Sequence, residues 1–144
     1  MPRQGEKTMT NSRFKFRLWD KKNKKMLYEH SKELDNYDRD ESYFSMESYI
    51  FYIINYFATS EDYILMQSTG QKDVNDTDIF EGDIVKFGID VDDIGVIKWD
   101  TDNSRFIIDE IFNNNISDFT NWYGKDLEIE SNIYEDKRFV EEQK

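Results

Sequence analysis

The stretch from Tyr63 to Phe87 limits what this chain can fold into more than any other part of the sequence. It reads YILMQSTGQKDVNDTDIFEGDIVKF, in which two apolar runs flank a polar turn and the second run includes the motif Glu-Gly-Asp-Ile-Val at 81–85. Short runs rich in Ile, Val, Phe and Tyr and bounded by turn residues are typical of β-strands. We therefore expect short strands joined by tight turns.

The same pattern continues at regular spacing towards the C-terminus. Turn-forming residues such as those at 102–104 separate the runs. Five short strands within about seventy residues favour a small SH3-like barrel or a curled antiparallel sheet. The expected strands are 63–67, 83–88, 94–99, 105–111 and 127–134.

The N-terminal part predicts a hairpin. Residues 13–20, RFKFRLWD, alternate basic and apolar side chains as a half-buried strand does, and 26–28 can begin a return strand after a turn around Asn23. Residues 1–12 show no periodicity, so we expect a disordered arm there. The codons before Met9 can contain a ribosome-binding sequence, which makes Met9 a candidate for the natural start, and the choice between Met1 and Met9 stays open.

The segment that follows the hairpin is harder to interpret. Residues 29–41 are polar and acidic, which favours a loop or insertion. Residues 43–57 are aromatic and β-branched, which favours a strand, but they are long enough for a short helix, and both readings stay open. Their nearly continuous apolar run indicates burial on more than one side. We expect this segment to drive self-association if the monomer leaves one face uncovered.

Taken together, the patterns predict a mainly β fold, or an α+β fold, in a single domain. No Gly-rich linker or internal repeat divides the chain. The expected organisation is a disordered arm at 1–12 and one domain at 13–144, with the hairpin and variable segment at 13–62 and the barrel at 63–136.

The charge of the chain is strongly negative and unevenly distributed. The net charge is -12 over 144 residues. Residues 1–27 carry nine Lys and Arg against two Asp and Glu, whereas residues 28–144 carry ten against twenty-nine. Because an acidic surface repels nucleic acid, any contact with DNA should be confined to the N-terminal segment.

Composition also excludes several classes of protein. The chain has no cysteine, which rules out disulfides, thiolate metal clusters and cysteine nucleophiles. No window approaches the length of apolar sequence that a membrane-spanning helix needs, and the N-terminus lacks the apolar core of a signal peptide. We expect a soluble protein that stays in the cytoplasm of the bacterial cell that makes it.

We find no pattern typical of a catalytic or metal site. His30 is the only histidine, so no multi-histidine metal site and no histidine-based triad can form. Residues 100–104 begin as a calcium loop does, but Arg105 and Ile111 stand where the required glycine and glutamate should be. Residues 73–77 fail in the same way, and we interpret both segments as hairpin turns. We expect no enzyme, no cofactor and no metal.

One basic and aromatic patch lies near the N-terminus. Such a patch can follow a phosphate backbone while its aromatic rings stack on bases. In the alternative, which we favour, the rings point into the core and the cations face solvent or pair with the protein's own acids. The candidate nucleic-acid contacts are Lys15, Arg17, Lys21, Lys22, Lys24 and Lys25, with Phe14, Phe16 and Trp19 interleaved.

Several segments resemble the YopX family, small proteins of phages and prophages of Gram-positive bacteria. The block at 63–87 carries most of the resemblance, and KFRLWDKKNKKMLYE at 15–29, GVIKWD at 95–100 and LEIESNIYE at 127–135 extend it. The resemblance implies a β-rich fold and a phage or prophage origin, and it brings no catalytic residues. The matching residues that we interpret as structural are Gly70, Glu81, Gly82, Asp83, Gly95, Asn132 and Tyr134.

This chain departs from the family pattern at a few positions. Gln71 stands where leucine is usual, Asn75-Asp76 replaces an Asn-Gly turn, Ser131 replaces a glycine, and Asp136-Lys137 replaces Asn-Pro. All of these positions lie in or beside predicted turns. They put the turn types in doubt rather than the fold.

The sequence favours a non-enzymatic phage or prophage accessory protein that binds another macromolecule. A divergent segment on a common scaffold suits recognition of a specific partner. The first alternative is a nucleic-acid-binding module that uses the basic N-terminal strand. The second is an acidic decoy that imitates DNA and blocks a host DNA-binding protein. We expect an unknown protein partner, self-association into a homo-oligomer and no membrane contact.

Overall fold

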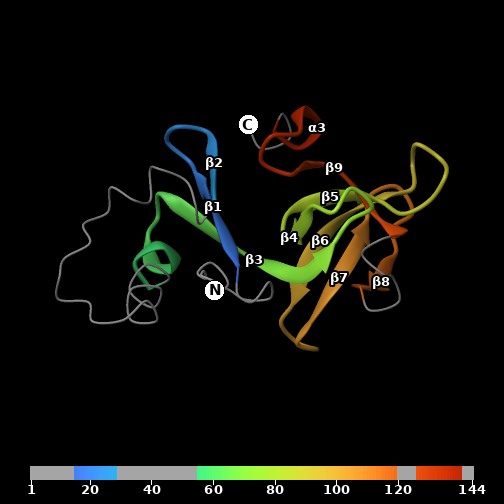
Figure 1. Ribbon diagram of the computed structural model, residues 1–144, viewed down its shortest axis with the longest axis horizontal. Coiled ribbons are helices and arrows are strands. Elements are labelled where there is room, and N and C mark those ends of the chain that lie inside the picture. Colours follow the sequence, from blue (N-terminus) through green and yellow to red (C-terminus); the bar gives the residue numbers. More distant parts are fainter. Residues whose placement is uncertain (1–14, 29–54, 120–125, 141–144) are drawn as a thin grey trace, which may run out of the picture. The chain divides into compact units, whose positions relative to one another are not determined.

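The computed structural model describes residues 15–28, 55–119 and 126–140. Its regular elements are mostly antiparallel strands in two sheets, which confirms the mainly β fold (Figure 1). The chain divides into two compact units, and the boundary between them falls inside a strand. We call Phe16–Gln67 the N-terminal unit, and Ser68–Lys144 together with Met1–Lys15 the C-terminal unit.

The N-terminal unit is built on a β-hairpin, coloured blue in Figure 1, and part of a third strand. Leu18 in the central strand lies opposite Leu27 on one side and Leu65 on the other. These residues, with Phe16 and Phe57, form the core of the unit. The strands are β1 (Phe16–Asp20), β2 (Lys25–Tyr28) and β3 (Tyr63–Lys72).

Both faces of β1 are covered. Every residue of the strand is buried, and Arg17 is only 3% exposed. The return strand is confirmed, but the prediction of a half-buried strand is wrong for residues 16–20, because the alternate side chains Arg17 and Trp19 are buried as well. Alternation of basic and apolar residues reports exposure reliably only when one face of a sheet meets water.

A short helix completes the core of the N-terminal unit. Residues 55–59 are helical, and Phe57 is 1% exposed. Its ring packs edge to face on Tyr63 with 4.8 Å between the ring centroids. The strand preference for 43–57 is therefore wrong at 55–57, where packing of one aromatic ring outweighs β-propensity.

Several sequence-based expectations fall on residues outside the described ranges. They concern the arm at 1–12, the start at Met9, the loop at 29–41 with His30, and most of the segment proposed for self-association. These expectations stay predictions.

The C-terminal unit is a five-stranded antiparallel sheet with the order β8-β7-β6-β5-β9. Four consecutive strands form a meander, and the last strand returns to pair with the first. This order, with the curling of the sheet into a half-barrel, is that of a small SH3-like barrel and confirms the expected fold. The strands are β5 (Asp83–Lys86), β6 (Ile94–Asp100), β7 (Arg105–Glu110), β8 (Ile116–Asp118) and β9 (Glu128–Asn132).

All five predicted strands of this region exist, but two strands were missed. β4 (Asp78–Phe80) and β8 have three residues each, too few to show an alternating pattern. β3 also runs five residues further than expected. It continues past Gly70, which has a φ of 83°, because the register with β4 shifts there in a bulge.

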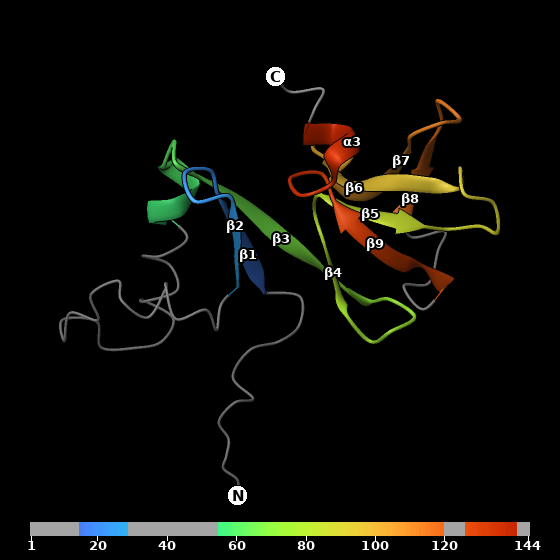
Figure 2. The ribbon, with the colours of Figure 1, turned by 90° about the horizontal axis from the view of Figure 1, so that it is seen from above.

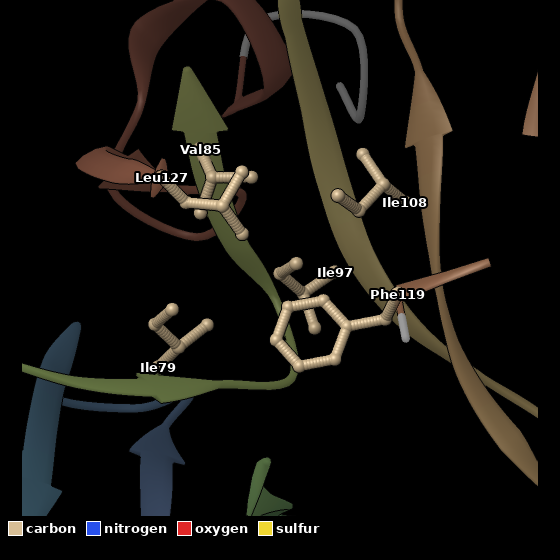
Figure 3. Close-up of a cluster of buried hydrophobic side chains, with 6 residues drawn as sticks. All are labelled: Ile79, Val85, Ile97, Ile108, Phe119 and Leu127. Atoms are coloured by element: carbon tan, nitrogen blue, oxygen red, sulfur yellow. The ribbon is translucent and has the colours of Figure 1, made fainter. Parts of the chain in front are cut away.

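The five-stranded sheet buries apolar side chains on both faces. Inside the curl, β4 to β7 together with Phe119 and Leu127 contribute one cluster, whose side chains converge in Figure 3. On the other face α3 (Lys137–Val140), which follows β9 in Figure 2, places Phe139 against Ile84, Ile94 and Val96. Full burial of one such side chain contributes about 1.5–3 kcal/mol. The clusters thus make the sheet a firm support for its loops.

Candidate functional site

The meander brings two loops to one end of the five-stranded sheet. Successive antiparallel strands alternate in direction, so the β5–β6 loop and the β7–β8 loop leave from the same end. The amide of Ile111 donates a hydrogen bond to the carbonyl of Ile94 at 3.1 Å, which joins the bases of the two loops. The β5–β6 loop is the yellow loop that projects from the sheet in Figure 1. We call residues 87–93 and 111–116 the loop end.

The loop end exposes four large apolar side chains. Ile89 is 95% exposed, Val91 80%, Phe112 55% and Ile116 60%. They are half of the eight large hydrophobic residues that are exposed within the described ranges. Single exposed apolar residues are ordinary, whereas these four lie on two loops at one end of the same sheet.

The β5–β6 loop has a defined shape. The Phe87 amide donates a hydrogen bond to the Asp93 carbonyl at 2.9 Å, which joins the ends of the loop. The Asp93 amide donates to the Asp90 carbonyl at 3.0 Å. The Asp90 amide donates in turn to Oδ2 of Asp93 at 3.1 Å. A side chain at Gly88 would collide with the Asp93 carboxylate. An ordered loop loses less conformational entropy when a partner binds.

The β7–β8 loop is organised around the carboxylate of Glu110, which is 9% exposed. That carboxylate accepts hydrogen bonds from Asn113 Nδ2 at 3.0 Å, Asn115 Nδ2 at 2.6 Å and Ser117 Oγ at 3.1 Å. The bond from Asn113 has the largest effect on the pKa of Glu110, burial opposes it, and the bonds from Ser117 and Asn115 help to hold that pKa below its usual value. Glu110 therefore stays ionised and fixes the loop.

The charge of the loop end is negative. Asp90 and Asp92 are exposed, and Asp93 is half-buried. β9 begins at the same end, because Glu128 lies opposite Lys86 at the end of β5, and Glu128 is exposed. The loop end therefore combines exposed apolar side chains with negative charge.

The structure separates the six candidate nucleic-acid contacts into two groups. Lys15 Nζ pairs with Oδ2 of Asp78 at 3.0 Å in the C-terminal unit, and Arg17 is buried in β1. Phe16 and Trp19 are buried as well, and Phe14 lies outside the described residues. The remaining four are exposed, namely Lys21, Lys22 and Lys24 in the β1–β2 turn and Lys25 at the start of β2.

Asp20 fixes the shape of that turn. Its carboxylate, in a residue that is 6% exposed, accepts the amides of Lys22 at 3.0 Å and Asn23 at 3.1 Å and the Asn23 Nδ2 at 2.7 Å. Burial acts to raise the pKa of Asp20, but the bonds from Asn23 and Lys22 outweigh it and hold the pKa below its usual value. The Lys21 amide also donates to the Asp62 carbonyl at 3.0 Å. The turn is therefore anchored at its base.

The Glu-Gly-Asp motif forms the turn between β4 and β5. Gly82 has a φ of 87°, a conformation that favours glycine. Its amide donates to the Ile97 carbonyl at 2.8 Å, and its own carbonyl accepts the Ile133 amide at 2.9 Å. Asp83 is 2% exposed and accepts the Phe80 amide at 2.8 Å. These bonds link β4, β6 and the segment after β9.

Other residues of the family pattern also hold the backbone. A Cβ at Gly95 would lie 2.5 Å from Ile108 Cγ2, so only glycine lets β6 and β7 approach. The Asn132 side chain accepts the amides of Tyr134 and Glu135, both at 3.0 Å, and so forms the turn after β9. Gly70 lies at the bulge of β3, and Glu81 and Tyr134 are half-buried.

The two segments that begin like calcium loops are turns. Asp73 Oδ1 accepts the amides of Asn75 and Thr77, both at 2.9 Å, and its Oδ2 accepts the amide of Ile129 at 3.0 Å. Asp100 accepts a bond from Asn103 Nδ2 at 2.7 Å. The interpretation as hairpin turns is confirmed. The bond to Ile129 was missed, because its partner is far away in the sequence.

The described ranges contain neither a cluster of metal-binding side chains nor a helix that could cross a membrane. No three His, Cys, Asp or Glu side chains there gather closely enough to hold a metal ion. In the same part of the chain, every helix is too short or too polar to cross a membrane.

The fold and the loop end define a small, acidic, SH3-like β protein that exposes apolar loops. Residues 15–141 match the family described as YopX protein, so the chain belongs to the YopX family and the resemblance is confirmed. The crystal structure of protein EF1440 from Enterococcus faecalis is similar, with a TM-score of 0.48 and 21% identity over 87% of this chain and 96% of that chain. The comparison with curated proteins found no match.

Proposed function

We propose that this protein is a non-enzymatic accessory protein of a phage or prophage that binds another protein through the loop end. The observation that carries the proposal is the exposure of Ile89, Val91, Phe112 and Ile116 on two loops with internal hydrogen bonds. Leaving such side chains in water is unfavourable, and each contributes about 1.5–3 kcal/mol when a partner buries it fully. A surface of this kind suits recognition more than stability.

The acidic residues with shifted pKa values support a non-enzymatic role. A general acid or base works best with a pKa near the operating pH. The pKa values of Asp20, Glu110 and Asp136 are all shifted down instead, away from that range. Each of these carboxylates accepts hydrogen bonds inside a turn, as a structural group does.

The charge of the loop end favours a basic partner. Asp90 and Asp92 alternate in the sequence with Ile89 and Val91, the two most exposed apolar residues. Both acids would face lysine or arginine on the other protein. A host protein whose DNA site is basic meets this requirement, which makes the DNA-imitating decoy the second candidate function. The two candidates differ in whether DNA competes with the protein for its partner.

The proposal is tested by affinity capture with matched variants. The tagged protein is used as bait in a nuclease-treated lysate of a phage-bearing host and eluted with a salt step. The double variant Ile89→Ser with Val91→Ser alters the loop end, and Tyr56→Ser alters an exposed ring of the N-terminal unit that is 44% exposed. A captured protein is then purified, and its Kd is measured for each form.

We expect the loop-end variant to raise Kd at least about tenfold, which corresponds to about 1.4 kcal/mol, and Tyr56→Ser to leave it unchanged. Competition of the partner by DNA would favour the decoy function. An equal Kd for the wild type and the loop-end variant, with circular dichroism showing both folded, would exclude the loop end as the binding surface.

A further inference from the structure

The β1–β2 turn is a second exposed surface, and it has the opposite charge. Lys21, Lys22 and Lys24 occupy three of its four positions, Lys25 follows as the first residue of β2, and all four are exposed. We call these four residues the lysine tip. It is the blue turn between β1 and β2 in Figure 1. Four cations in so short a segment are unusual in a chain whose net charge is -12.

The lysine tip has a fixed backbone. Asp20 binds two amides and one side chain within the turn, and the Lys21 amide is tied to the Asp62 carbonyl. Lys24 has a φ of 55°, in the left-handed region, which closes the turn before β2 begins. The Asp20 carboxylate is buried against the backbone. The lysine side chains therefore extend from a rigid turn whose own acid faces inward.

The acids beside the tip reduce its positive charge without cancelling it. Glu61 and Asp62 are exposed in the neighbouring turn, and the backbone bond from Lys21 places that turn next to the tip. Four cations against these two exposed anions and the Asp20 carboxylate leave a local excess of one positive charge. Substitution of these two acids would change the net charge around the tip without altering the lysines themselves.

Aromatic stacking is not part of this surface. The two aromatic residues of β1, Phe16 and Trp19, are 9% and 6% exposed. Stacking on bases requires an accessible ring. The turn can therefore contact phosphate groups only through charge. Such contacts do not distinguish one nucleotide sequence from another.

We propose that the lysine tip binds the phosphate backbone of a nucleic acid, independently of its sequence and independently of the loop end. The first surface would hold a protein and the second a nucleic acid, so the chain would bridge the two. Binding of nucleic acid by the lysine tip does not rest on the proposed function, because the two surfaces share no residue, whereas bridging rests on both.

The test measures the salt dependence of binding to a short fluorescent DNA duplex and to the corresponding single strand. If each lysine neutralises one phosphate, log K should fall with log salt with a slope of about -3.6 for the duplex and about -2.8 for the single strand. The double variant Lys21→Gln with Lys22→Gln should reduce the slope for the duplex by about 1.8.

Two further variants make the test specific to the tip. Lys72→Gln with Lys137→Gln removes the same charge from exposed residues of the C-terminal unit, and we expect an unchanged slope. Glu61→Gln with Asp62→Asn should tighten binding at low salt, because it removes the neighbouring negative charge.

Three results would overturn the proposal. They are no binding of the wild type at low salt, an equal loss of slope in both lysine double variants, and equally tight binding of polyglutamate. The last result would identify the tip as a general site for polyanions, which includes acidic proteins. Circular dichroism of each variant establishes that the altered affinity belongs to a folded protein.

Discussion

The loop end and the lysine tip use the same structural device for opposite purposes. In each, a buried carboxylate accepts hydrogen bonds from its own turn, Glu110 in the C-terminal unit and Asp20 in the N-terminal unit. The side chains that face solvent then differ completely, with apolar and acidic groups on one surface and lysines on the other. The acids in this chain therefore fall into two classes. Some accept hydrogen bonds and shape turns, and others are exposed to solvent.

The largest effects should come from the two cores that support these surfaces. Ile108 and Leu18 are both 0% exposed, one under the five-stranded sheet and one in the N-terminal unit. Ile108→Ala and Leu18→Ala should each lower the free energy of unfolding by about 2–5 kcal/mol. We expect amide exchange to rise in β6 and β7 for the first variant and in β1 and β3 for the second.

Urea unfolding, followed by fluorescence and circular dichroism, measures both losses. If both variants raise exchange equally in all of these strands, the two units unfold as one cooperative body. The two surfaces would then share a single stability instead of depending on separate cores.

The next largest effects should come from the turn carboxylates. Glu110→Ala leaves the polar groups of its loop without their acceptor and should cost about 1–3 kcal/mol, and Asp20→Ala should cost a similar amount in the β1–β2 turn. Glu110→Ala should weaken partner binding and leave DNA binding unchanged, and Asp20→Ala should do the reverse. Thermal unfolding and the two binding assays check this. A variant that weakens both activities would show that its effect is not local.

The strands of the fold could be predicted because their signals are local. Ile84 and Val85 follow a glycine turn in an apolar run, and both are fully buried in β5 as the pattern indicates. β8 could not be predicted in this way, because only its pairing with β7, such as Asp118 opposite Ile107, identifies it as a strand. The register of two paired strands cannot be predicted from the sequence of either strand alone.

The surfaces were harder to predict than the strands. Ile89 and Val91 resemble core residues by type, but both are exposed. The residues beside them in the sequence do not indicate whether another element covers them. Arg17 has the reverse problem, since a charged residue in an alternating strand is expected to face water and is buried here. Exposure depends on which elements meet in space, and a single sequence does not state that.

The acids that shape turns should make stability depend on pH. Asp136 accepts bonds from Arg138 and from Ser131 Oγ at 2.6 Å. The bonds from Arg138 have the largest effect, burial opposes them, and together with Ser131 they hold the pKa of Asp136 well below its usual range. The pKa values of Asp20 and Glu110 are shifted down as well.

A carboxyl group with a lower pKa in the folded state stabilises the fold above its unfolded pKa. That value is about 3.9 for Asp and about 4.3 for Glu. The stabilisation is then lost as the pH falls through the folded pKa. We therefore expect a nearly constant Tm from neutral pH down to about 5 and a fall in acid below that. Asp136→Asn should reduce the fall of Tm below about pH 5. If the variant and the wild type lose the same Tm in acid, Asp136 contributes nothing to this pH dependence.

The smallest effect should come from an ion pair that belongs to neither surface. Lys98 Nζ lies 2.6 Å from Oδ2 of Asp109 on neighbouring strands, with side chains that are 51% and 37% exposed. Exposed pairs of this kind contribute about 0.2–1 kcal/mol, because water screens them and ordering the side chains costs entropy. Lys98→Gln should therefore leave Tm, partner binding and the DNA salt slope almost unchanged. If it lowered the salt slope by half as much as the double variant Lys21→Gln with Lys22→Gln does, DNA binding would follow the total charge of the protein and would not depend on the lysine tip.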